Sequence, residues 1–479
     1  MPATPSRTRN DGSATAMRQP WSILFLLGAA QFMVVLDITV VNVALPSIGA
    51  ALGFAAADLE WVVTIYVLFT GGLLLLGGRL ADRFDRRLVF LTGLLVFTLA
   101  SLLSGLAASG EMLIGARAAQ GVGAALLTPA ALSIVTSFYT GTQRAKALGA
   151  WSAIGSAGAA VGVVLGGMLT TWLTWEWIFL VNVPVGLTAA ALALRVVPAS
   201  PPTVGARALD LPGALLVVAG LVVLVDAIDG APEHGWGSAR TLVLAALALA
   251  LLATFARVEA GSRQPLVPPA IWRMRSLVGS AAVLLGVTGV LVATFFLNSL
   301  YLQGVNGATA LETGLGFLPF AFSIGIAAHL ASALMPRSGS RVLAATGLVL
   351  AAAGGFVLAA APDRAAYAAD ILPGLLAIGF GVGLVFPAVS VTAMSHVAPE
   401  RAGLAAGVLS TAHEIGAALG VAVVAAVAAI SDAASHAGIA AGYQDGFVAA
   451  AAVALGLAAL AVVAIPDVKP RGAAQAMAH

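Results

Sequence analysis

The stretch WSILFLLGAAQFMVVLDITVVNVALP, residues 21–46, decides the fold class of this chain. Asp37 is its only charged residue. An α-helix rises about 1.5 Å per residue, so this run is long enough to cross a hydrocarbon layer of roughly 30 Å. We therefore expect residues 21–46 to form a helix that spans a membrane.

The composition extends this expectation to the whole chain. Its 479 residues are 60% hydrophobic and 9% charged, whereas a soluble domain carries about 25% charged residues. Mean hydropathy is +1.01. These values predict an all-α polytopic membrane protein. The sequence has no cysteine, which excludes disulfides and thiolate metal sites, and we expect neither a metal nor a cofactor.

Glycine, proline and charge clusters divide the chain into fourteen apolar segments of spanning length. The expected helices are 21–46, 58–78, 88–107, 111–136, 146–169, 176–194, 211–229, 239–256, 277–302, 312–334, 341–360, 370–394, 403–430 and 446–465.

The connecting loops predict the orientation. Most of the 23 Lys and Arg residues fall in loops on one side of the expected helices, and cytoplasmic loops collect such residues. Both termini are therefore expected in the cytoplasm, which requires an even number of helices. An even number also allows twelve helices instead of fourteen. If residues 211–229 and 239–256 did not span the membrane, all the other loops would stay on the same sides.

An internal repeat relates two parts of the chain. GVGAALLTPAALS begins at Gly121 and GFGVGLVFPAVS at Gly379, and an offset of 258 residues aligns their prolines. The same offset aligns GAAVG from Gly158 with GAALG from Gly416. Transporters built from such repeats place their substrate site between the halves, near the bilayer midplane.

The repeat predicts the domain organisation. We expect two six-helix bundles joined by a linker that contains two inserted transmembrane helices. The expected parts are a cytoplasmic tail at 1–20, an N-terminal bundle at 21–194, the linker at 195–276, a C-terminal bundle at 277–465 and a second cytoplasmic tail at 466–479.

The loop GRLADRFDRR, from Gly78 to Arg87, combines an acid at a helix end with a dense cluster of arginines. Arginines can hold carboxylates or helix C-terminal carbonyls, and a carboxylate can dock at a helix N-terminus. The loop is a candidate latch that holds one conformation, formed by Gly78, Asp82, Arg83, Arg86 and Arg87. An ordinary positively charged cytoplasmic loop is the alternative.

This loop resembles the GxLADRxGRR signature of the major facilitator superfamily. RAAQGVG at 117–123 resembles the helix-4 signature of the same superfamily. Two further stretches resemble motifs of its fourteen-helix drug:proton antiporter family: LDITVVNVALP at 36–46 and WEWIFLVNVPVG at 175–186. The resemblance implies the major facilitator fold and multidrug efflux. Asp85 stands where the signature has its second glycine, and we expect it to adopt the left-handed turn conformation that aspartate tolerates.

The stretch GAAVGVVLGG at 158–167 resembles the antiporter signature of the fifth helix, but Val163 replaces its proline. Glycines at four-residue spacing let another helix approach closely. We expect Gly158, Gly162, Gly166 and Gly167 to form a helix-packing motif, and close packing alone explains them as well as antiport does.

Asp37 lies deep in the first helix. A carboxylate there costs roughly 2.5 to 3.5 kcal/mol, so it needs a partner or a cavity. Arg117 lies at a similar depth in the fourth helix, so the two can form an ion pair or a water-bridged pair. A change in their separation would let Asp37 bind and release a proton. The alternative is a fixed ion pair that never titrates.

Glu414 is the second acid within a membrane helix and lies close to the midplane. We expect it to face the cavity and take part in proton coupling, with a buried interhelical hydrogen bond as the alternative. His413 is its neighbour, but consecutive helical residues point about 100° apart. His413 is expected to be packed and satisfied.

Polar and aromatic residues on the helices expected to line the cavity are candidates for substrate contact. A mostly apolar site with a few amides, phenols and acids suits amphipathic organic molecules. The candidates are Gln31, Phe32, Asn42, Tyr66, Phe295, Asn298, Tyr301 and Gln303.

These features predict a proton-coupled exporter that works by alternating access between its halves. The proton gradient is its expected energy source, because no P-loop pattern is present to bind a nucleotide. Expected partners are a lipophilic or amphipathic small molecule, protons and the lipid bilayer, without nucleic acid. We expect a monomer in a bacterial inner membrane.

Rival functions remain at this stage. A lipid or natural-product exporter of the same fold, or a uniporter in which Asp37 is structural, fits the same motifs. A membrane-embedded enzyme is disfavoured, since the six histidines are scattered and no large extramembrane domain is present. A scaffold that does not transport would function normally after Asp37 and Glu414 are neutralised.

Overall fold

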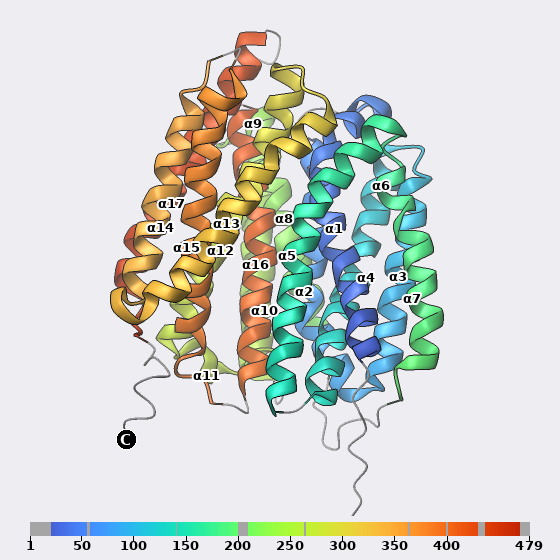
Figure 1. Cartoon of the computed structure of the whole chain (residues 1–479). Coiled ribbons are helices and arrows are strands. Elements are labelled where there is room, and N and C mark those ends of the chain that lie inside the picture. The colour runs from blue at the N-terminus through green and yellow to red at the C-terminus, as the bar shows by residue number, and fades with distance from the viewer. Residues whose placement is uncertain are drawn as a thin grey trace, which may run out of the picture.

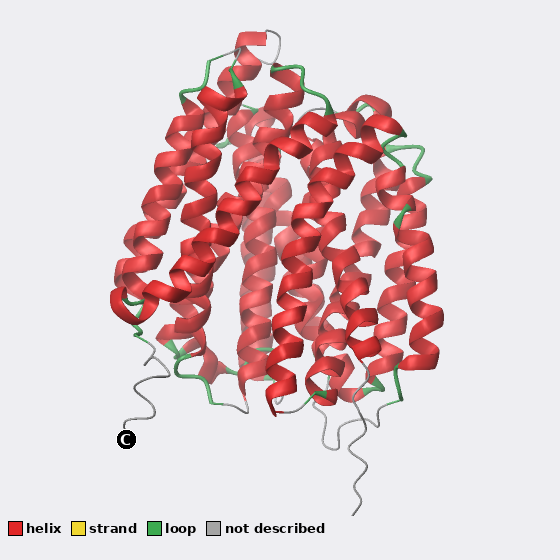
Figure 2. Ribbon diagram, in the orientation of Figure 1, coloured by secondary structure: helices red, strands yellow, loops and turns green. Residues whose placement is uncertain are grey.

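The structure, a computed structural model, describes residues 21–54, 58–139, 141–199, 209–262, 265–362, 365–398, 401–429 and 436–469. Within these ranges all the regular elements are helical (Figures 1 and 2). Fourteen helices of the described chain are long and apolar enough to span a membrane. The predicted fold class is confirmed with fourteen helices, and the alternative of twelve is wrong.

The helices form two bundles with two further membrane helices between them (Figure 1). The N-terminal half contains α1 (Trp21–Leu52), η1 (Asp58–Glu60), α2 (Trp61–Arg83), α3 (Arg86–Gly105), α4 (Gly110–Phe138), α5 (Gly141–Trp172), α6 (Trp177–Leu180) and α7 (Asn182–Val196). The inserted segment contains α8 (Leu211–Asp229), α9 (Ala231–His234), α10 (Ala239–Gly261) and α11 (Pro269–Trp272). The C-terminal half contains α12 (Arg275–Leu300), η2 (Tyr301–Val305), α13 (Ala310–Ser338), α14 (Ser340–Ala359), η3 (Tyr367–Ile371), α15 (Leu372–Met394), α16 (Ala402–Ala428) and α17 (His436–Ala464).

Local capping explains several helix starts. Ser109 accepts a hydrogen bond from the Met112 backbone at the start of α4. Thr309 and Glu312 form a reciprocal capping box at the start of α13. Such caps satisfy backbone N–H groups that have no partner inside the helix.

Two sequence expectations about helix ends are wrong. The first helix was expected to end at Pro46, but α1 continues to Leu52, because a proline removes only one donor and the Ile48 side chain after it is fully buried. The final helix begins at His436, ten residues before the expected 446.

The expected left-handed conformation of Asp85 is also wrong. Its backbone has φ −58° and ψ 118°, and its side chain accepts a hydrogen bond from the Arg87 backbone at 2.9 Å. Asp85 is therefore the N-cap of α3, a position that aspartate favours without any positive φ. The turn forms by capping rather than by glycine-like backbone freedom.

Helix packing repeats between the two halves. In the N-terminal half, Gly166 of α5 lies against Val40 of α1, where an added Cβ would come within 2.9 Å of Val40 Cα. In the C-terminal half, Gly416 of α16 lies against the Leu285 carbonyl of α12. Both pairs follow from glycines that allow backbones to approach closely. The aligned helices of the sequence repeat thus pack on equivalent partners.

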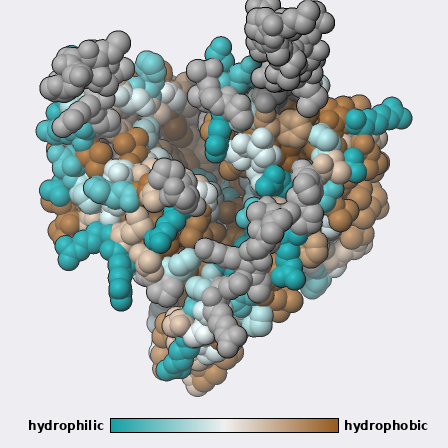
Figure 3. Space-filling view, turned by 90° about the horizontal axis from the view of Figure 1, so that it is seen from below, coloured by the Kyte–Doolittle hydropathy of each residue, from teal (hydrophilic) through white to brown (hydrophobic). Residues whose placement is uncertain are grey.

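The two halves meet at the end of the molecule opposite the start of α1, which we call the outer face; the end where α1 begins is the inner face. Ser299 Oγ donates to the Asn42 carbonyl at 2.6 Å, and Gln303 Nε2 donates to the Val43 carbonyl at 2.9 Å. Seen from the inner face, the surface is hollowed between the halves (Figure 3). The conformation is closed at the outer face and open toward the inner one.

The inserted helices are attached to α2 near both of its ends. Trp61 Nε1 donates to Asp229 Oδ2 at 3.0 Å near the outer face. Near the inner face, Arg79 Nη2 donates to the Pro265 carbonyl in the segment after α10. Glu259 of α10 accepts hydrogen bonds from the backbone that follows Pro265. The inserted pair is therefore tied to the N-terminal half.

Close packing of α16 on α12 predicts that Gly416→Ala destabilises the protein. The added Cβ would meet the Leu285 backbone, which cannot move aside as a flexible side chain can. Overpacking of this kind costs about 1–3 kcal/mol. Thermal unfolding in detergent measures the loss. Gly456→Ala on α17 is the matched control, since its Cβ would meet nothing within 4 Å, and an equal effect of both variants would contradict the packing argument.

Candidate functional site

The carboxylate of Asp37 lies at the centre of a buried hydrogen-bond network in the N-terminal half. Arg117 Nη1 donates to its Oδ2. Its Oδ1 accepts from Gln120 Nε2 at 2.7 Å and from Asn182 Nδ2 at 3.0 Å. All four side chains are buried, with Asp37 and Arg117 fully inaccessible. The sequence expectation of an ion pair at this depth agrees with this geometry.

Arg117 is held by several groups besides Asp37. Its Nε donates to the Val62 carbonyl of α2 at 2.9 Å, and its guanidinium lies 4.2 Å from the centre of the Tyr66 ring. Gln120 lies one helical turn after it on α4 and also donates to Ser101 of α3 at 2.9 Å. The network therefore fixes α1, α2, α3, α4 and α7 relative to one another.

In the observed conformation the carboxylate of Asp37 has three side-chain donors, one of which is the arginine counter-charge. Hydrogen bonds and an opposite charge both stabilise a buried carboxylate.

Two members of the network, Gln120 and Asn182, were missed from the sequence. Gln120 had a usable signal, because the motif RAAQ places it one turn from Arg117 on the same helix face. Asn182 had a weaker one as an amide inside the apolar stretch WEWIFLVNVPVG. Depth along a helix does not reveal which distant amide meets a carboxylate.

Glu414 lies at the contact between the two halves. It is half-buried on α16 and faces α2, where a Cβ added to Gly71 would lie 2.5 Å from Glu414 Cβ. His413 faces α12 instead, with Nδ1 3.0 Å from Thr288 Oγ1. The two neighbours therefore point to different helices. Glu414 is placed to respond when α2 and α16 move relative to each other.

The substrate candidates fall into two groups, those that are partly accessible and those that are committed to contacts within the protein. Gln31, Phe32 and Phe295 are half-buried. Phe295 packs against the rings of Phe317 and Phe320 at 4.8 and 5.0 Å. These three candidates keep accessible surface in the observed conformation, and so does Gln303, whose amide also takes part in the outer contact described above.

The remaining candidates are committed to contacts within the protein. Asn42 and Gln303 belong to the outer contact between the halves. Tyr66 packs on Arg117, and Tyr301 donates to the Pro362 carbonyl at 2.5 Å. Asn298 is fully buried, and its amide donates to the Thr294 carbonyl of its own helix at 2.9 Å.

The candidate latch between α2 and α3 contacts the N-terminal half and the inserted segment. Arg87 Nη1 donates to the Val197 carbonyl at the end of α7, at 3.3 Å. Asp82 and Arg83 are exposed, Gly78 and Arg86 are half-buried. Arg79, which binds the Pro265 carbonyl, was missed as part of this loop, although it stands inside the quoted motif.

The glycines of α5 face two different helices. Gly158, Gly162 and Gly166 pack against α1, and a Cβ added to Gly158 would lie 3.3 Å from the Phe32 carbonyl. Gly167 packs against α13, with its added Cβ 2.6 Å from the Ala310 carbonyl. One face of α5 thus packs within the N-terminal half, and another face packs against α13 of the C-terminal half.

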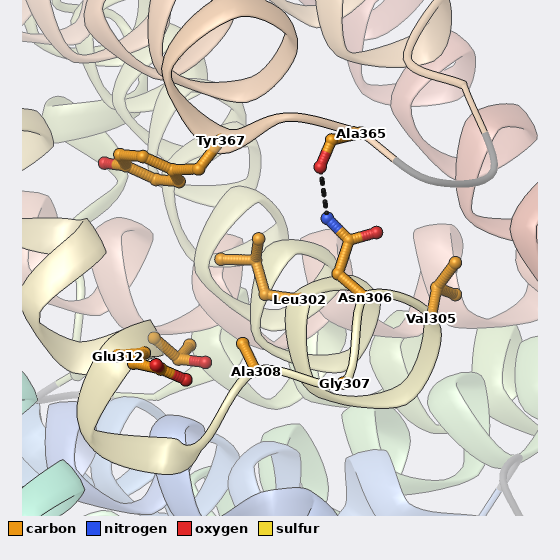
Figure 4. A pocket seen from close by; sticks show the side chains of 9 residues that line it. Leu302, Val305, Asn306, Gly307, Ala308, Glu312, Ala365 and Tyr367 are labelled. Atoms are coloured by element: carbon orange, nitrogen blue, oxygen red, sulfur yellow. Dashed lines mark hydrogen bonds between the residues drawn. The ribbon is translucent and has the colours of Figure 1, made fainter.

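A separate cavity of about 600 Å³ lies at the outer end of the C-terminal half (Figure 4). Asn306 donates to the Ala365 carbonyl at 2.9 Å beside it, and Glu312 belongs to the helix cap of α13. Tyr367 covers the opposite side and donates to the Gly316 carbonyl at 2.5 Å. The residues that line it include none of the predicted site residues.

Sequence comparison places the chain among transporters. Residues 27–421 match the family model of the Major Facilitator Superfamily. The chain is 41% identical over 464 residues to a puromycin resistance protein of Streptomyces alboniger, covering 93% of this chain and 90% of that protein. It is 41% identical over 463 residues to a cephamycin export protein of Amycolatopsis lactamdurans, covering 95% and 94%. A lincomycin resistance protein of Streptomyces lincolnensis is 35% identical over 429 residues, covering 87% and 86%.

Solved structures share the same fold. A bacterial homologue of the human lysosomal transporter Spinster, in an inward-facing and occupied conformation, superposes with a TM-score of 0.67. It is 17% identical in sequence, and the match covers 92% of this chain and 96% of that one. An auto-inhibited peptide transporter of the POT family gives a TM-score of 0.64 at 18% identity, covering 93% and 95%.

The buried network predicts strong energetic coupling between Asp37 and Arg117. Arg117→Met would leave the carboxylate buried without its counter-charge, and such a change costs about 3–5 kcal/mol of unfolding free energy. The double variant Asp37→Asn with Arg117→Met removes both charges and should lose less than the sum of the single variants. Denaturant unfolding in mixed micelles measures the cycle. Losses that add within about 0.5 kcal/mol would show that the two groups are not coupled.

Proposed function

This chain belongs to the major facilitator superfamily, and we propose that it is a proton-coupled exporter of drug-like small molecules that works by alternating access. The single observation that carries the proposal is the position of Glu414, a half-buried acid at the contact of α2 with α16 across the two halves. A carboxyl in such a place changes its surroundings when the halves move.

The Asp37–Arg117 pair supports a second proton-linked step. In the observed conformation, which is open toward the inner face, Asp37 is held by three donors and fits the state after proton release. In the opposite conformation we expect Arg117 to withdraw, so that Asp37 takes up a proton from outside. Return to the inward-open state would then expel that proton as the pair closes again.

The substrate class follows from the half-buried residues and from the relatives. Phe32, Phe295 and Gln31 offer aromatic and amide contacts, and Glu414 offers a carboxyl group. The named relatives confer resistance to puromycin and lincomycin or export cephamycin. Amphipathic antibiotics and other drug-like molecules are the proposed cargo.

The proton gradient is the proposed energy source, without a cofactor. Each inward proton supplies about 2.3 kcal/mol per 100 mV and roughly 1.36 kcal/mol per pH unit. We place the protein in a bacterial inner membrane as a monomer, with both termini cytoplasmic, so that protons enter from the outer face while cargo leaves. The arginine loop between α2 and α3 is the proposed inner latch, which closes against its partners when the inner face closes.

Transport assays test this function directly. Purified protein is inserted inside-out in proteoliposomes with an acidic lumen, and accumulation of ethidium, tetraphenylphosphonium, puromycin and lincomycin is measured. Without a membrane potential, antiport of one proton should raise the accumulation ratio of the cargo about tenfold per pH unit of gradient. Glu414→Gln and Asp37→Asn should lose this response while still exchanging labelled drug between the two sides.

Glu233→Gln is the matched control, because Glu233 is an exposed acid on α9, away from both networks. Its response should equal that of the wild type. If drug accumulation by the wild type does not depend on the pH gradient, the protein is a uniporter. If Glu414→Gln and Asp37→Asn both respond to the gradient as the wild type does, these two acids do not couple protons to transport.

A further inference from the structure

Glu60, at the outer end of α2, is a buried acid that the transport cycle above does not use. Its side chain is fully buried, and neither carboxyl oxygen has a hydrogen-bond partner within the described part of the chain. Two further acids are near it: Asp58 lies in the same short helix η1, and Asp229 accepts a hydrogen bond from Trp61, the residue that follows Glu60. It sits in η1, immediately before Trp61.

Glu60 lies where the N-terminal half, the inserted helices and the C-terminal half meet. η1 packs against α2 and against α16, and α9 also packs on α16. Asp229 of α8 already accepts a hydrogen bond from Trp61. Arg240 of α10 lies 3.9 Å from Asp226 and 2.9 Å from His234 Nδ1. The described outer end of α16 contributes only apolar side chains.

These surroundings favour the neutral form of Glu60 in the observed conformation. An ionised carboxylate that is buried without a partner costs several kcal/mol, and two nearby carboxylates add repulsion. Movement of α16 away from η1, which opening of the outer face requires, would bring water to Glu60. A hydrated glutamate ionises above about pH 4.3. Proton binding and outer closure are thus linked.

We propose that Glu60 is a proton-binding site at the outer face, and that its protonation closes this face of the transporter. The inference rests on the alternating-access part of the proposed function, not on the identity of the cargo. Because Glu60 stays at the outer end, its proton returns to the side from which it came. Glu60 therefore sets how external pH controls closure, and it adds nothing to the number of protons exchanged per drug.

Distance measurements across the outer face test this site. The chain has no native cysteine, so Leu173→Cys, directly after the outer end of α5, and Leu315→Cys on α13 can be labelled with nitroxides alone; both positions are exposed. Glu414→Gln in the background removes one other titrating acid. The populations are measured in lipid nanodiscs between about pH 5 and about pH 8.5. As the pH is raised, the ratio of outer-closed to outer-open molecules should fall by up to about tenfold per pH unit, which is the largest change that one linked proton can cause.

Glu60→Gln should abolish this pH response and stay closed throughout, and Glu60→Asp should restore a response. Asp226→Asn is the matched control, because Asp226 is another acid in the same region and lies beside Arg240. The pH response of this variant should equal that of the wild type. Glu60→Gln should be at least as stable to heat as the wild type, since the amide mimics the neutral acid. Unfolding of this variant would overturn the inference.

Two further outcomes separate this inference from the proposed function. A pH response that is equal in the wild type and in Glu60→Gln overturns the role of Glu60, whatever the transport assay gives. A response that depends on Glu60, together with drug efflux that ignores the pH gradient, upholds the outer site and rejects proton-coupled export. Proton-to-drug stoichiometry should be the same in Glu60→Gln and wild type, and a lower value in the variant overturns the assignment.

Discussion

The buried carboxylate of Asp37 is the constraint on which the N-terminal half depends. A charge in a membrane helix must find its partners inside the protein, because lipid offers none. Arg117, Gln120 and Asn182 supply them from α4 and α7, and Val62 of α2 holds the arginine in turn. Five helices therefore take their relative positions from the hydrogen-bond network around one carboxylate.

The C-terminal half is held together differently. Within its described residues no ion pair joins two helices, and close contacts between backbones take that role. Gly289 of α12 meets Gly420 of α16, and Gly347 of α14 meets the Gly381 carbonyl of α15. Glu414 is the intramembrane acid on this side, and it faces the other half instead of its own core. Charged groups thus hold the N-terminal bundle together, whereas the intramembrane acid of the C-terminal bundle lies at its contact with the other half.

Prediction from the sequence was most successful for features that the apolar environment of the membrane dictates. Hydropathy and charge bias predicted fourteen spans, and the cost of a buried charge pointed from Asp37 to Arg117. It failed where the answer depends on local backbone or on distant partners. Asp85 caps a helix where a left-handed turn was expected, and α1 passes through Pro46. Glu60 was missed because a single acid beside a loop looks solvated until the fold covers it.

The attachment of α8 and α10 to α2 has a mechanical consequence. Hydrogen bonds from Trp61 to Asp229 and from Arg79 to the Pro265 carbonyl fasten the inserted pair at both ends, and Gly72 packs on Val218 between them. Because α8 and α9 also pack on α16, the inserted segment touches both halves. In the proposed alternating-access cycle, the hydrogen-bonded contact with α2 would be kept and the contact with α16 would change.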